Sequence, residues 1–203
     1  HGLVSVAKFL ANDPRITSTG SRIDGFETDS RKSLWFGVDS IVEALRLRRE
    51  GIKNPILVLG YTLPSRLGEA AAKKITLTVS NFEALDVIAK ARRRPEFHLK
   101  LDTGMHRQGF QEHEMAKLIA ALRQYRLVPE GAYSHYAFPE HARDSRMQLN
   151  CFERCVRELA AADQLPVAGR LPVIGATDNA AAPVAAIGHQ GGVGACLGCH
   201  GRN

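Results

Sequence analysis

The feature that most constrains the fold is a regular series of short apolar runs. Four of these runs begin at residues 34, 55, 75 and 97, so that successive starts are 21, 20 and 22 residues apart. An interval near 21 residues accommodates a strand, a short loop and a helix of about three turns. With two later runs included, the predicted strands are Leu34–Val38, Pro55–Gly60, Ile75–Val79, Phe97–Leu101, Ala132–Tyr136 and Pro172–Ala176.

The segments between these strands carry signals of amphipathic helices. Ser40 with Glu43, and Ser80 with Glu83, match the capping box that starts a helix. Apolar residues then recur at helical spacing, which predicts an inward face for each helix. The predicted faces are Ile41/Ala44/Leu45, Phe82/Leu85/Ile88/Ala89, Met115/Leu118/Ile119/Leu122 and Leu149/Phe152/Val156/Leu159, with Leu3/Val6/Ala7/Leu10 in a first helix.

Alternation of strand and helix predicts a parallel sheet with right-handed crossovers. An open doubly wound sheet and a closed (β/α)8 barrel both fit this pattern. No G-x-G-x-x-G follows a predicted strand, which disfavours the dinucleotide-binding version of the open sheet. A complete barrel needs ~250 residues, and about six strands are predicted here, so the barrel version would be truncated.

Composition and charge exclude several classes of partner and environment. The chain carries 27 Lys and Arg against 21 Asp and Glu, a net charge of +6, but the basic residues are scattered and aromatic residues make up only 6%. A basic stripe interleaved with aromatic residues is therefore missing, and we expect no nucleic-acid partner. No apolar run approaches ~18 residues, so we expect no membrane span. The four cysteines are expected to be reduced thiols of a cytoplasmic protein, and no metal site is expected.

Two strand ends carry unusual polar residues. Alternation along residues 98–102 points His98, Lys100 and Asp102 to one face, and Arg107 follows shortly after the strand. The next strand end contains His135. In a parallel barrel, function lies at the carboxyl ends of the strands. The residues alone leave alternatives open: a structural ion pair of Lys100 with Asp102, a core histidine and a surface arginine.

The run HLKLDTGMHRQGF (98–110) resembles the signature of fold-type III alanine racemases, which use pyridoxal phosphate (PLP). Other segments agree in order and spacing, namely His1-Gly2, FGVDSIVEALRLRREGI (36–52), PILVLGYT (55–62), TLTVSNFEAL (76–85) and AYSHYA (132–137). The resemblance implies a PLP-binding (β/α)8 TIM-type barrel over residues 1–181, incomplete at both ends. It also implies interconversion of L- and D-alanine, which supplies D-alanine for peptidoglycan, by a homodimer.

The same resemblance implies roles for individual residues. Lys100 corresponds to a lysine that is often carbamylated and braces the neighbouring arginine. Arg107 corresponds to the arginine that bonds the phenolic oxygen of PLP, and His135 to the histidine beside the cofactor ring. Asn179 corresponds to the asparagine of the phosphate-binding segment, which reads here Gly175-Ala176-Thr177-Asp178-Asn179, with the family's histidine and serine replaced.

Further departures shape the expectations for this chain. The family's PLP-attaching lysine would precede residue 1, and residues 182–203 form an atypical Gly- and Ala-rich tail that is expected not to belong to the native barrel. A shifted reading frame is one hypothesis for that tail. We expect the 203 residues alone to be an inactive fragment. The alternatives are a non-catalytic barrel remnant and a single-domain barrel protein of PLP homeostasis.

Overall fold

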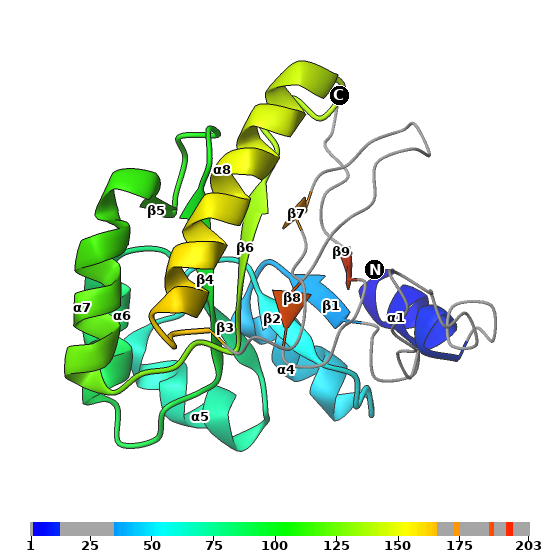
Figure 1. Cartoon of the computed structure of the whole chain (residues 1–203). Coiled ribbons are helices and arrows are strands. Elements are labelled where there is room, and N and C mark those ends of the chain that lie inside the picture. The colour runs from blue at the N-terminus through cyan, green and yellow to red at the C-terminus, as the bar shows by residue number, and fades with distance from the viewer. Residues whose placement is uncertain (1, 13–34, 166–172, 175–186, 189–193, 197–203) are drawn as a thin grey trace.

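The fold is a curved parallel sheet with helices packed on its outer side (Figure 1). A computed structural model describes residues 2–12, 35–165, 173–174, 187–188 and 194–196. The helices are α1 (Leu3–Asn12), α4 (Ile41–Arg49), α5 (Leu67–Ala72), α6 (Phe82–Lys90), α7 (Met115–Tyr125) and α8 (Ala142–Ala161), with short 3-10 turns η1 (Pro64–Arg66) and η2 (Glu112–Glu114). The strands are β1 (Trp35–Val38), β2 (Ile56–Val58), β3 (Thr76–Val79), β4 (Phe97–Asp102), β5 (Phe110–Gln111), β6 (Gly131–His135), β7 (Val173–Ile174), β8 (Ile187–Gly188) and β9 (Gly194–Cys196).

The strand order confirms the predicted α/β architecture. The main path runs β7-β6-β4-β3-β2-β1-β9, and each neighbouring pair along it is parallel. Each strand from β1 to β4 lies beside the next one in the chain, as expected when a helix returns the chain across the same face. A sheet of this order with helices outside is part of a (β/α) barrel.

Two short strands from the C-terminal tail join this sheet. The outer edge of β1 pairs with β9, in which Gly194 lies opposite Trp35. The other late strand, β8, pairs antiparallel with β6. Both strands belong to the tail in which no strand was predicted. Residues 13–34 and the rest of residues 182–203 lie outside the described residues.

Local signals explain where two helices begin. Ser40 caps α4 as predicted. Its hydroxyl accepts a hydrogen bond from the Glu43 amide, and the Glu43 carboxylate accepts one from the Ser40 amide. The predicted cap at Ser80 is wrong by one residue. Asn81 caps α6 instead, since its side-chain oxygen accepts from the Ala84 amide at 2.7 Å. Both residue types can cap a helix, and the extended backbone at Asn81 decides between them.

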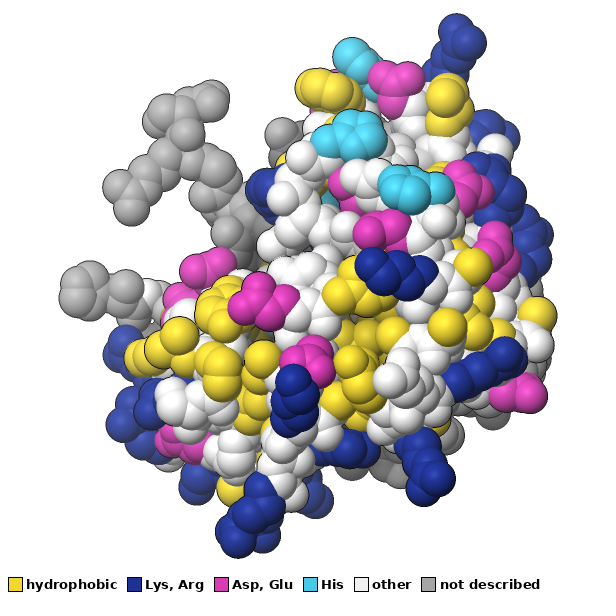
Figure 2. All heavy atoms as spheres, turned by 90° about the vertical axis from the view of Figure 1, so that its left-hand side faces the viewer, with side chains coloured by type: hydrophobic (Ala, Val, Ile, Leu, Met, Phe, Trp, Pro, Cys, Tyr) yellow, Lys and Arg dark blue, Asp and Glu magenta, His cyan; other side chains and the backbone are white. Residues whose placement is uncertain are grey.

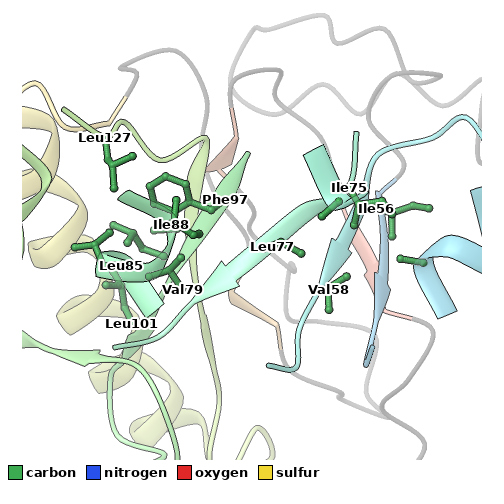
Figure 3. Close-up of a cluster of buried hydrophobic side chains, with 14 of the residues drawn as sticks. Ile56, Val58, Ile75, Leu77, Val79, Leu85, Ile88, Phe97, Leu101 and Leu127 are labelled. Atoms are coloured by element: carbon green, nitrogen blue, oxygen red, sulfur yellow. The ribbon is translucent and has the colours of Figure 1, made fainter. Parts of the chain in front are cut away.

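The outward face of the strands forms the apolar core. Figure 3 shows Leu85 and Ile88 of α6 packed with Val79 of β3 and with Phe97 and Leu101 of β4. These five side chains are each no more than 3% exposed. Burial of this kind stabilises the sheet–helix interface by roughly 1.5–3 kcal/mol for each large apolar side chain.

The inward face of the strands is polar and shows that the sheet curls. Thr78 of β3 contacts the Tyr133 hydroxyl of β6 at 3.0 Å, although β4 lies between these strands in the sheet. The rings of Trp35 on β1 and His98 on β4 lie 5.0 Å apart between their centroids. Side chains of non-adjacent strands can meet in this way only across the interior of a curved sheet, so these residues line the inside of the barrel.

The His98 imidazole lies at the start of β4, away from the carboxyl ends of the strands. Its Nε2 atom lies 3.7 Å from the Glu130 carboxylate, too far for a hydrogen bond. Burial lowers the pKa of His98 from 6.5 to about 3, so this side chain is neutral at physiological pH. His98 is therefore a core histidine of the barrel interior.

Arg48 on α4 links two connecting segments, one before β2 and one before β3. Its guanidinium donates hydrogen bonds of 2.7 to 2.9 Å to four backbone carbonyls, those of Ile52, Asn54, Lys73 and Lys74. These carbonyls lie in the turns that lead into β2 and β3. Because the planar guanidinium serves several acceptors at once, Arg48 holds the entry points of two neighbouring strands in register.

Helix α8 is longer than the stripe that predicted it. Its buried residues are Gln148, Phe152, Cys155 and Leu159, whereas the predicted inward face contained Leu149 and Val156. Those two residues are only partly buried. The buried face of α8 is therefore shifted by about one residue from the predicted face, and it includes Gln148. In the described part of the chain no helix is long and apolar enough to cross a lipid bilayer.

Candidate active site at the carboxyl ends of β4 and β6

Lys100 on β4 is the most buried charged side chain of the candidate site. It is 2% exposed, its Nζ donates a hydrogen bond to the Leu101 carbonyl at 3.1 Å, and it lies 5.4 Å from the centroid of the Tyr133 ring. Burial lowers the pKa of Lys100 from 10.5 to about 8, Asp102 opposes this shift, and the positive charge of Arg107 adds to it. The ammonium therefore lies close to its deprotonation point at physiological pH.

Asp102 was expected to be the charge partner of Lys100, but its carboxylate accepts hydrogen bonds from the backbone of the loop after β4. Its Oδ1 atom accepts hydrogen bonds from the amides of Gly104 at 3.1 Å and His106 at 3.0 Å. Its Oδ2 atom lies 3.6 Å from Nδ1 of His106. Among the described residues, Asp102 and Lys100 form no ion pair, so the carboxylate acts on Lys100 only through longer-range attraction.

The loop after β4 is tight and returns Arg107 to the strand end. Gly104, His106 and Gly109 all have positive φ. A Cβ on Gly109 would lie 2.7 Å from the backbone nitrogen of Asp102, so only glycine allows this close approach. Arg107 itself is exposed, and its guanidinium forms no hydrogen bond or ion pair with the described residues. It is therefore available to bind an anionic oxygen.

His135 at the end of β6 completes the group. Its imidazole is partly buried, and burial, Lys100 and Arg107 together lower its pKa below 6.5. The charges of Lys100 and Arg107 both act on His135, and the charge of Arg107 also acts on Lys100, so the three side chains lie in one region at these strand ends. Asn179, the fourth predicted site residue, lies outside the described residues.

Two further residues of this region were not singled out by the sequence. Tyr133 provides the ring beneath Lys100, and its hydroxyl lies 3.0 Å from that of Thr78. Gln148 of α8 contacts the ends of both strands. Tyr133 could have been found because it shares the inward face with His135 at spacing two. The one sequence signal for Gln148 was its position four residues before Phe152, which places it on the same helix face as that apolar residue.

The site lies where a parallel barrel places its chemistry. The arrowhead of β6 in Figure 1 points to the upper part of the molecule, where the loop after β4 also lies. Figure 2 shows one outer face of the molecule, with hydrophobic side chains in its middle and histidine and acidic side chains toward the top. Fold and site together define a parallel (β/α) barrel whose strand ends carry a cluster of basic side chains.

Comparison with known proteins assigns the family. The sequence profile of the family described as "Alanine racemase, N-terminal domain" matches residues 27–170, and the chain belongs to this family. It is 38% identical over 143 residues to "Alanine racemase 1" of Caldanaerobacter subterraneus subsp. tengcongensis, a match that covers 68% of this chain and 32% of that protein. It is 44% identical over 100 residues to an alanine racemase of Geobacillus stearothermophilus, covering 47% of this chain and 26% of that one.

A solved structure agrees with the fold. The alanine racemase of Clostridium difficile 630 superposes with a TM-score of 0.63 at 25% sequence identity, covering 86% of this chain and 44% of that chain. The chain spans less than half the length of each of these three relatives.

Proposed function

We propose that this chain is the cofactor-binding barrel of a PLP-dependent alanine racemase, which interconverts L- and D-alanine. The observation that carries the proposal is the group of basic residues Lys100, Arg107 and His135 at two strand ends, where the carboxylate of Asp102 is bound by the amides of its own loop. Such a surplus of basic groups is suited to an anionic ligand.

The donor set fits PLP, which bears a phosphate and a phenolic oxygen. Arg107 would bind the phenolic oxygen, His135 would lie beside the ring, and Asn179 would contact the phosphate, as the family resemblance implies. When bound, the cofactor supplies the electron sink for the carbanion at Cα of the substrate. The protein's own groups then set orientation and charge around it.

Lys100 would control the charge next to Arg107. With a pKa near 8, a substantial fraction of its amine is neutral at slightly alkaline pH, and only a neutral amine can react with CO2 to form a carbamate. A carbamate would replace the repulsion between Lys100 and Arg107 by attraction. This supports the proposal that Lys100 is carbamylated and braces Arg107.

The wider setting follows from the family and is part of the same proposal. The complete enzyme would be a cytoplasmic homodimer that supplies D-alanine for peptidoglycan. No nucleic acid or membrane partner is proposed, because the resemblance implies a small-molecule substrate.

The test uses the protein produced from its natural gene, supplied with PLP and L-alanine. Formation of D-alanine, followed by chiral chromatography, is the expected result, together with an absorbance band of protein-bound PLP near ~420 nm. Bound PLP without turnover would instead support the PLP-homeostasis alternative. Neither bound PLP nor turnover above that of free PLP would support a non-catalytic barrel remnant.

A further inference from the structure

Gln148 is a buried polar residue that the proposed chemistry does not use. It lies on the second turn of α8, is 6% exposed, and its amide contacts both strand ends of the site. Its Oε1 accepts a hydrogen bond from the Ala137 amide at 2.9 Å. Its Nε2 donates to the His135 carbonyl at 3.2 Å and to Oγ1 of Thr103 at 3.4 Å. The side chain therefore bridges the segments that follow β4 and β6.

The contact with Thr103 begins a directional chain of hydrogen bonds. The Ser134 hydroxyl donates to the Leu101 carbonyl at 2.9 Å, so its single hydrogen is used. In the 2.7 Å contact between the two hydroxyls, Thr103 must then be the donor, which leaves its oxygen free to accept from Gln148. This series of hydrogen bonds ends on the Leu101 carbonyl, which also accepts a hydrogen bond from Nζ of Lys100 at 3.1 Å.

Packing holds the β4 loop against the same amide. Gly104 has φ near +142°, and a Cβ built on it would lie 3.2 Å from Cγ of Gln148. Glycine is therefore needed for the loop to close on the glutamine. The Gly104 amide is meanwhile bound to Asp102, so the loop that carries Arg107 is fixed from both sides.

We propose that Gln148 is a positioning residue that locks the ends of β4 and β6 together, so that His135 stays facing Lys100 and Arg107. The chemical meaning of this role rests on the proposed racemase function, but the contacts that define it do not. An apolar side chain of similar length would leave the Ala137 amide without its acceptor and the two strand ends without their bridge.

The test compares the wild-type chain with Gln148→Met by NMR. In the variant, exchange of the Ala137 amide proton should be about tenfold faster, because that proton loses its hydrogen bond. The pKa of His135 should rise, since burial and the charges of Lys100 and Arg107 hold it down in the wild type. The control is Gln124→Met, an exposed residue of α7, which should leave both quantities unchanged.

A second variant keeps the proposal testable if Gln148→Met does not fold. Thr103→Val breaks the hydrogen-bond chain but leaves the direct bonds of Gln148 to the β6 segment, so the Ala137 amide should remain slow. The proposal is overturned if a folded Gln148→Met shows wild-type exchange and a wild-type His135 pKa. It is also overturned if Thr103→Val exposes the Ala137 amide. Neither measurement needs PLP or turnover, so an inactive enzyme would refute the proposed function alone.

Discussion

Replacing Lys100 with methionine should stabilise the folded chain at neutral pH, although it removes a residue of the candidate site. The pKa of Lys100 falls from 10.5 to about 8 on folding, mainly because the ammonium is buried. Since each pH unit between the two pKa values corresponds to ~1.4 kcal/mol, the charged lysine costs the fold about 3 kcal/mol at pH 7. Methionine lacks the bond to the Leu101 carbonyl, worth roughly 1 kcal/mol, so the net gain should be about 2 kcal/mol.

The difference in stability between the wild type and Lys100→Met should change sign with pH. Below pH 8 both the folded and the unfolded wild type carry the proton on Lys100, and the full cost is present. Between pH 8 and 10.5 the folded chain has released the proton and the unfolded chain still holds it, so the wild type gains stability relative to the variant. At pH 10.5 the variant should be the less stable protein by about 1 kcal/mol, because only the lost hydrogen bond remains.

Urea unfolding at several pH values, in buffer free of dissolved CO2, measures the difference. Lys53→Met, at an exposed position, is the matched control and should show no crossover. The reasoning is refuted if Lys100→Met is less stable than the wild type at pH 7 and the difference stays constant up to pH 10.5. That outcome would mean that the Lys100 ammonium is well solvated or fully paired in the folded chain.

Two further predictions concern stability away from the site. Arg48→Lys should lower the free energy of unfolding by about 2 kcal/mol, because one ammonium cannot serve four carbonyls, while Arg49→Lys at an exposed position should be close to neutral. Asn81→Ala should cost about 1 kcal/mol through loss of the cap on α6, and Ser80→Ala should cost clearly less. Chemical denaturation decides both, and equal losses within either pair would contradict the contact described for it.

The main strands and helices were predictable because their signals are local. The outward positions of β3 and β4 are apolar at spacing two, and α7 contains the predicted stripe from Met115 to Leu122, so periodicity alone located these elements. The late strands β8 and β9 were not predictable. They have two and three residues, and they form only through pairing with β6 and β1, which are distant in sequence.

The candidate site was predicted in part. Alternation placed Lys100 on the inward face, and the contact with the Tyr133 ring bears this out. The partner of Asp102 was mistaken, because a carboxylate at a strand end can bind the amides of a tight loop as well as a nearby ammonium. Gln148 was missed because periodicity detects apolar stripes and does not mark a polar residue within one.

The central claim is that the basic cluster at the carboxyl ends of β4 and β6 binds the anionic cofactor. Its most direct test is the affinity for PLP of the natural gene product, measured for the wild type, Arg107→Met and Arg93→Met. Arg93 is an exposed arginine between α6 and β4 and serves as the matched control. Arg107→Met should weaken PLP binding by at least about tenfold, since a charge-assisted hydrogen bond is lost, and Arg93→Met should bind like the wild type. Equal affinity in all three proteins, or equal loss in both variants, would contradict the claim.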